Sequence, residues 1–142
     1  MINKNFKPNQ TIITGILKTS FFDGTTARIT IDINDKTKRE LIPWVKDAYS
    51  NCNKKFLPEI LTTKESTIIG LHTQYSMKLY DADGVLQGNI DPQTLGKLPA
   101  GIAVDVFTTY NPEKCNGMYP QSISIDMEDG KIPQKESFNP FA

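Results

Sequence analysis

The strongest constraint on the fold is an alternation of polar and apolar residues with a period of two. In residues 26–33, polar residues alternate with the apolar residues Ala27, Ile29, Ile31 and Ile33. This spacing places the apolar side chains on one face of a β-strand and the polar side chains on the other. Residues 11–18 are β-branched and apolar, a composition that also favours a strand. Residues 21–24 (Phe-Phe-Asp-Gly) predict a hairpin loop between these two strands.

Four further segments have strand-like patterns, namely residues 67–71, 74–80, 102–109 and 121–127. The sequence Asp81-Ala82-Asp83-Gly84 predicts a tight turn, because Asp suits its first position and Gly supplies a positive φ. Six strands joined by short loops predict a mainly β domain, either a barrel or a sandwich.

One segment has helical spacing instead. Leu41, Val45 and Tyr49 fall on one side of residues 35–52, which predicts an amphipathic helix that begins near Asn34 or Asp35. Pro43 lies inside this helix. Since proline removes a backbone hydrogen bond, we expect the helix to start, bend or divide near this residue.

The 142 residues suit one domain, which we expect to span residues 1–127. Residues 128–142 are polar and rich in turn-forming residues, so we expect a mobile C-terminal tail. The first residues lack the apolar core of a signal peptide, and no stretch approaches the roughly 18 apolar residues of a membrane span. We therefore expect a cytoplasmic protein without membrane contacts.

Charge gives only a weak indication of the partner. The chain has 16 basic and 16 acidic side chains. Residues 1–64 hold 11 basic and 6 acidic side chains, whereas residues 65–142 hold 5 and 10. This asymmetry permits a basic face for an anionic partner. Cys52 and Cys115 lack the spacing of a zinc or redox site, so we expect two reduced thiols.

The sequence offers little for enzyme chemistry. His72 is the only histidine and has no evident catalytic partner, so a structural or partly exposed role is expected. The turn at residues 81–84 lacks the remaining ligands of a calcium loop, and Gly96-Lys97 lacks the spacing of a phosphate loop. We expect no enzyme activity, metal or cofactor.

Outward aromatic and basic side chains favour nucleic-acid binding. If Met77 and Leu79 face the core, Lys78 and Tyr80 face outward, where an aromatic ring can stack on a base. The rings of Tyr80 and Phe107 either do this or pack beneath a helix or loop. The predicted nucleic-acid-binding residues are Lys18, Phe21, Phe22, Arg28, Lys54, Lys55, Lys78, Tyr80 and Phe107.

The paired rings of Phe21 and Phe22 leave a similar choice open. They either stack on bases, or one of them plugs an end of the barrel.

Three segments, in this order, carry a resemblance to a known family: Asp81-Ala82-Asp83-Gly84, residues 101–106 (Gly-Ile-Ala-Val-Asp-Val) and Asn116-Gly117-Met118-Tyr119. With the surrounding pattern of residues 11–142, they resemble the single-stranded-DNA-binding proteins of tailed bacteriophages. The resemblance implies an OB fold, here a five- to six-stranded antiparallel barrel with one helix. It also implies sequence-tolerant binding and protection of single-stranded DNA during phage replication or recombination, in the cytoplasm of the bacterial host.

The same resemblance implies that the tail recruits partner proteins through Phe138, Pro140 and Phe141 and competes with DNA. Residues 128–142 hold three acidic side chains against two lysines, so this competition is expected to be weak. This hypothesis predicts a monomer or a small homo-oligomer.

A second hypothesis is a β-rich phage structural protein, or an assembly adaptor, that acts through subunit contacts. The neutral charge and the two arginines suit it.

Overall fold

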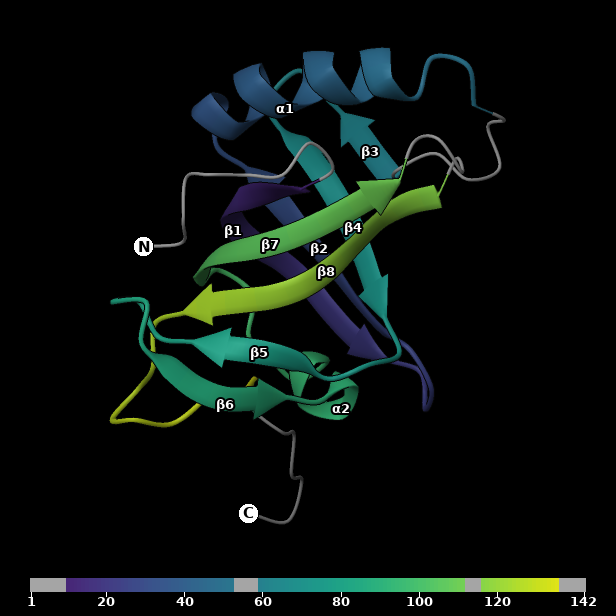
Figure 1. Cartoon of the computed structure of the whole chain (residues 1–142). Coiled ribbons are helices and arrows are strands. Elements are labelled where there is room, and N and C mark those ends of the chain that lie inside the picture. The colour runs from purple at the N-terminus through teal and green to yellow at the C-terminus, as the bar shows by residue number, and fades with distance from the viewer. Residues whose placement is uncertain (1–9, 53–58, 112–115, 136–142) are drawn as a thin grey trace, which may run out of the picture.

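The computed structural model describes residues 10–52, 59–111 and 116–135 (Figure 1). Within these residues, one sheet contains β1 (Gln10–Phe22), β2 (Ala27–Ile33), β3 (Glu59–Thr62), β4 (Thr67–Thr73), β5 (Met77–Tyr80), β6 (Leu86–Ile90), β7 (Ala103–Asn111) and β8 (Asn116–Ile125). Two helices, α1 (Asp35–Ala48) and α2 (Pro92–Leu95), accompany the sheet. The prediction of a mainly β fold is confirmed.

The strand order is β3-β4-β2-β1-β7-β8-β5-β6, and β5 runs parallel to β8 while the other neighbours are antiparallel. β4 and β5 are separated only by residues 74–76, yet β4 pairs with β2 and β5 pairs with β8. The sheet therefore curls back on itself, and Figure 1 shows β7 and β8 crossing in front of β1, β2 and β4. The expected five- to six-stranded antiparallel barrel is wrong, because the described sheet has eight strands, is mixed and has an open order.

The period-two pattern of the sequence fills the inside of this curled sheet. In β2, Ile29 and Ile31 are buried and Arg28 is exposed, as predicted. β1 is the longest strand at 13 residues and pairs with both β2 and β7. This close pairing is possible because Gly15 has no side chain. A Cβ atom at this position would collide with the carbonyl group of Asp32.

Helix α1 covers one end of the curled sheet, at the top of Figure 1. The Asn34 side chain caps it by accepting a hydrogen bond from the Thr37 backbone N–H at 2.8 Å. The helix ends at Ala48, four residues before the predicted end. Pro43 neither starts nor divides the helix. Proline has no backbone N–H and so leaves one helix carbonyl group unpaired, but Pro43 is exposed and this carbonyl group lies on the solvent side.

Aromatic side chains join α1 to the sheet. The rings of Trp44 and Tyr110 lie 4.2 Å apart between centroids, and the Tyr49 ring meets Tyr110 edge-on at 6.5 Å. Burial and the neighbouring Tyr49 raise the pKa of Tyr110 to about 12. Cys52, just beyond the helix, is disulfide-bonded, so the expectation of a reduced thiol is wrong for this residue. Cys115 lies outside the described residues.

Residues 128–135, the first part of the expected tail, lie against the domain. Ile132 packs against the core and Pro133 is buried. The Lys135 ammonium donates to the Ser20 carbonyl oxygen at 2.7 Å, and the Lys135 backbone N–H donates to the Lys97 carbonyl oxygen at 2.8 Å. These contacts join the segment to the end of β1 and to the residue Lys97 beyond α2. The expected partner-binding residues Phe138, Pro140 and Phe141 lie outside the described residues.

Candidate nucleic-acid interface

Three side chains from three strands form one row on the outer surface of the curled sheet. Arg28 of β2 pairs with Phe21 of β1 on one side and with His72 of β4 on the other. Residues directly opposite each other on paired strands share a face, with Cβ atoms about 4.5–5.5 Å apart. The register therefore places a guanidinium group between two aromatic rings.

Two tyrosines extend this row. The ring of Tyr119, from β8, meets His72 edge-on, with centroids 5.9 Å apart and planes at 72°. Tyr75 lies in the connection between β4 and β5 and is 77% exposed, while Phe21 is 59% and Tyr119 42% exposed. We call Phe21, Arg28, His72, Tyr75 and Tyr119 the aromatic face. It presents four rings and one cation to solvent.

A pocket of about 500 Å³ lies at the His72 end of the aromatic face. Its described lining is His72, Thr73, Gln74, Tyr75, Ser76, Thr109, Tyr119, Pro120 and Gln121. The pocket thus combines aromatic walls with hydroxyl and amide groups. This composition suits a small planar ligand with polar edges.

The loop at the Phe21 end places a carboxylate close to the cation. The Asp23 carboxylate accepts hydrogen bonds from the backbone N–H groups of Thr26 at 2.7 Å and Thr25 at 2.9 Å. These bonds, and in smaller part the positive charge of Arg28, lower the pKa of Asp23 below its usual value. Asp23 therefore stays ionised and partly neutralises the field of Arg28.

Three other predicted site residues lie on a different part of the sheet. Phe107 of β7 pairs with Ser122 of β8, which pairs in turn with Lys78 of β5. Tyr80 is two residues further along β5. We call Lys78, Tyr80 and Phe107 the β5–β7 face. Phe107 and Tyr80 are both half-buried.

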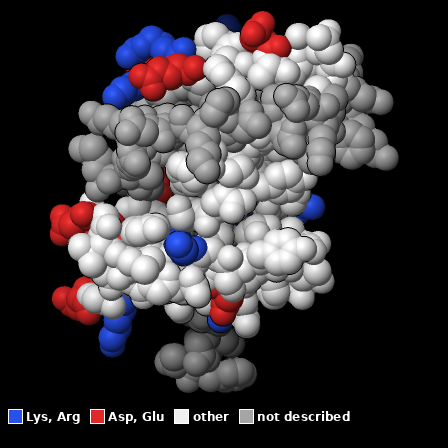
Figure 2. Space-filling model, viewed as in Figure 1, with Lys and Arg blue, Asp and Glu red and all other residues white. Residues whose placement is uncertain are grey.

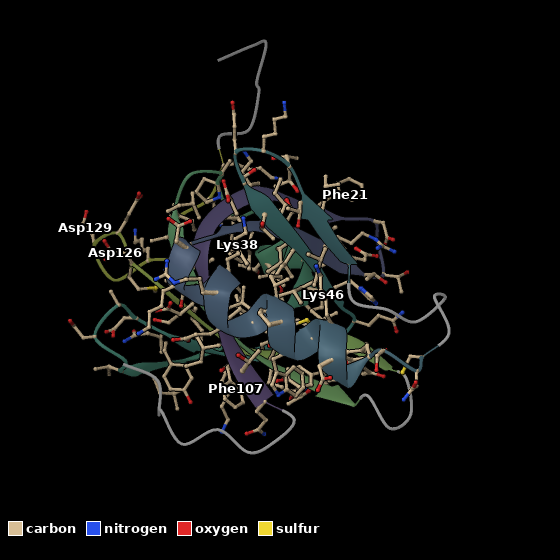
Figure 3. The ribbon with its side chains drawn as sticks, turned by 90° about the horizontal axis from the view of Figure 1, so that it is seen from above. Phe21, Lys38, Lys46, Phe107, Asp126 and Asp129 are labelled. Carbon is tan, nitrogen blue, oxygen red and sulfur yellow. The ribbon has the colours of Figure 1, made fainter. Side chains whose placement is uncertain are left out.

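The two faces point in different directions. Figure 3 shows Phe21 and Phe107 on opposite sides of the molecule. The predicted residues therefore do not line one shared groove. The side that Figure 2 shows is largely uncharged among the described residues, and basic side chains gather with acidic ones over the start of α1.

The remaining predicted residues have separate positions. Phe22 is half-buried, packs against the core and lies beside Gly96, whereas Phe21 is exposed. Both belong to β1 and not to the hairpin loop in which they were predicted. Lys18 is exposed at a bulge in β1. Lys54 and Lys55 lie outside the described residues.

Sequence reasoning missed Tyr75 and Tyr119 as site residues, and for His72 it expected a structural or partly exposed role and no part in binding. An outward position of His72 follows from the alternation in β4, where Ile69, Leu71 and Thr73 are buried. Tyr119 precedes the strand that was predicted at residues 121–127. Its position next to His72 depends on a fold in which β8 approaches β4, which no local pattern reveals.

The described part of the chain contains no group of three His, Cys, Asp or Glu side chains that could hold a metal ion. Among the same residues, no helix is long and apolar enough to cross a membrane.

No family model and no curated protein matches the sequence. Solved structures do match the fold. The single-stranded DNA-binding protein from bacteriophage Enc34 is 10% identical, with a TM-score of 0.54 over 96% of this chain and 88% of that one. The same protein in complex with single-stranded DNA is 11% identical, with a TM-score of 0.50 over 96% and 91%.

A third match is gp2.5, a single-stranded DNA-binding protein encoded by bacteriophage T7, at 12% identity and a TM-score of 0.46 over 92% of this chain and 90% of that one. The resemblance stated from the sequence is thus confirmed for the fold: solved structures similar to this chain are phage single-stranded DNA-binding proteins, and the chain shares the fold of the Enc34 protein.

Proposed function

We propose that this protein binds single-stranded DNA, with little dependence on sequence, through the aromatic face. The observation that carries the proposal is the cross-strand row in which Arg28 lies between Phe21 and His72, with Tyr119 beyond. The OB-like fold supports it, because OB folds bind oligonucleotides on an outer face of their strands and through the adjoining loops.

The chemistry of the aromatic face fits an unpaired strand. Every base has a π-face, so stacking on Phe21, Tyr75 or Tyr119 contributes about 1–3 kcal/mol per base without selecting a sequence. Bases in a duplex are already stacked and paired, so exposed rings favour the single strand. Arg28 can contact a phosphate or stack on a base between the two rings.

The size of the row agrees with a short binding site. Neighbouring strands lie about 4.8 Å apart, so Phe21 and His72, two strands apart, are separated by about 10 Å. Tyr119 and Tyr75 lengthen the row beyond His72. This span suits the lower part of the range of about 4–16 nucleotides per OB fold. With one arginine on the face and a neutral chain, we expect a modest affinity with a weak salt dependence.

By the family resemblance, we also propose that the protein protects displaced strands during phage replication or recombination. A tail that recruits partner proteins through Phe138, Pro140 and Phe141 belongs to the same proposal.

The direct test is a fluorescence anisotropy titration with labelled oligo-dT at low salt. We expect binding at micromolar protein or below, and at least roughly tenfold weaker binding to a duplex of the same length. Tyr119→Ala should weaken binding to oligo-dT without unfolding the protein, since this ring is 42% exposed. No binding of wild-type protein, or equal binding of duplex, would contradict the proposal.

A further inference from the structure

We infer that the pocket at the His72 end of the aromatic face is a base pocket that prefers bases with an exocyclic amino group. This inference rests on the proposed function. It adds a local selectivity, at one nucleotide position, to a surface that otherwise binds any sequence.

The pocket has the shape of a site for one base. His72 and Tyr119 meet nearly at a right angle, so a base stacked on one ring presents its edge to the other. Tyr75 also lines the pocket. Its backbone N–H donates to the Thr73 hydroxyl at 3.0 Å, and that hydroxyl donates to the Tyr75 carbonyl oxygen at 3.2 Å, which fixes the connection that carries the ring. A volume of about 500 Å³ is large enough for a purine nucleotide.

The polar groups of the pocket set the selectivity. The Gln74 side-chain amide donates from Nε2 to the Thr26 hydroxyl at 3.4 Å. The Gln121 amide donates from Nε2 to the Thr109 hydroxyl at 3.2 Å. Both glutamines line the pocket, and among the described residues neither Oε1 atom accepts a hydrogen bond. The pocket therefore contains two side-chain amides that donate to neighbouring hydroxyls and keep their oxygens available to a ligand.

Acceptor oxygens distinguish the bases by their edges. Adenine, cytosine and guanine each carry an exocyclic amino group with two N–H donors. Thymine carries O4 in place of an amino group and keeps N3–H as its one donor on that edge, so O4 would face a glutamine oxygen without a proton between them. The pocket should therefore accept an amino-bearing base more readily than thymine.

The experiment compares adenine with nebularine, the purine that lacks only the amino group. Each is placed once, at the centre of a short labelled oligo-dT, and binding is measured by anisotropy. We expect the adenine oligonucleotide to bind roughly two- to tenfold more tightly than the nebularine one, the range for one or two net hydrogen bonds.

The variant Gln74→Leu/Gln121→Leu should bring this ratio to about one. Gln87→Leu is the matched control, because Gln87 lies on β6 outside this pocket and bonds to Asp81. It should leave the ratio unchanged. Equal binding of the adenine and nebularine oligonucleotides by wild-type protein would overturn the base pocket while the proposed function stands. Failure to bind any of these oligonucleotides would overturn the proposed function itself.

Discussion

The aromatic face and the β5–β7 face both place aromatic and basic side chains on the outside of the same curled sheet, but their surroundings differ. Phe21 is 59% exposed and pairs with Arg28. Phe107 is half-buried and pairs with the half-buried Ile12 on one side and Ser122 on the other. An outward position on a strand is therefore not sufficient for a stacking site. The ring also needs an open face and a cation within reach of the ligand.

The largest expected difference between the two faces comes from truncating their phenylalanines. Phe21→Ala should weaken binding of oligo-dT by about 1–3 kcal/mol, roughly five- to 150-fold, with little loss of stability. Phe107→Ala should leave affinity within about twofold but lower the free energy of unfolding by about 1–2 kcal/mol, less than for a fully buried ring. Anisotropy and urea denaturation measure the two quantities. The reverse result would move the binding site to the β5–β7 face.

Charge removal gives the next largest effect. Arg28→Gln should weaken binding severalfold and reduce the slope of log K against log salt by about 0.7, the change for one lost phosphate contact on a single strand. Lys78→Gln should leave the slope unchanged, because Lys78 lies on the other face. Titrations at four or more salt concentrations give the slopes. Equal slopes for Arg28→Gln and wild type would show that Arg28 does not contact a phosphate.

The capping side chains of the two helices, Asp91 and Asn34, should contribute differently to the free energy of unfolding as the pH changes. Asp91 caps α2 by accepting from the Thr94 backbone N–H at 2.7 Å, and contacts with Thr94 lower its pKa below the usual 3.8. Because folding lowers this pKa, the ionised Asp91 carboxylate stabilises the folded protein above about pH 3.8. This stabilisation is lost as the pH falls through the folded-state pKa.

Asp91→Ala should therefore cost about 0.5–2 kcal/mol at pH 7 and progressively less in strong acid. Asn34→Ala, at the cap of α1, should cost a similar amount at both pH values, because its amide does not titrate. Urea denaturation of each variant against wild type at the two pH values measures this difference. A cost of Asp91→Ala that does not change with pH would exclude the ionised cap.

The smallest effect is expected for the carboxylate beside Arg28. Asp23→Asn keeps an oxygen that can accept from Thr25 and Thr26 but removes the negative charge, so binding of oligo-dT should tighten roughly two- to threefold. Asp83→Asn, in the exposed turn after β5, should have no effect. Anisotropy at low salt resolves this change, and weaker binding by Asp23→Asn would indicate that the loop itself has moved.

Much of the sheet could be predicted from the sequence because period-two patterns are local. The predicted strands correspond to β1, β2, β4, β5, β7 and β8. β3 and β6 were missed. β3 has only four residues, three of them exposed, and the first four residues of β6 are all exposed and include Gly88 at φ 114°. The curl of the sheet depends on the pairing of β5 with β8, which are more than 30 residues apart. No local pattern encodes that pairing.

The candidate site was only partly predictable, for the same reason. Arg28 was identified as an outward residue and Phe21 as a candidate in a loop, but their common row with His72 requires the register of β2 with β1 and β4. The alternation treats Phe107 and Arg28 as equivalent outward positions. Only the packed sheet shows that one of them is half-buried and the other exposed.

The connection between β4 and β5 has a consequence for dynamics. Residues 74–76 join the two parts of the curled sheet and also line the pocket. A ligand held there would oppose local opening at this junction, because binding to the closed form adds to its stability by mass action. Amide hydrogen exchange at Tyr75 should therefore slow when DNA binds, making this one backbone N–H a reporter of occupancy and of sheet closure together.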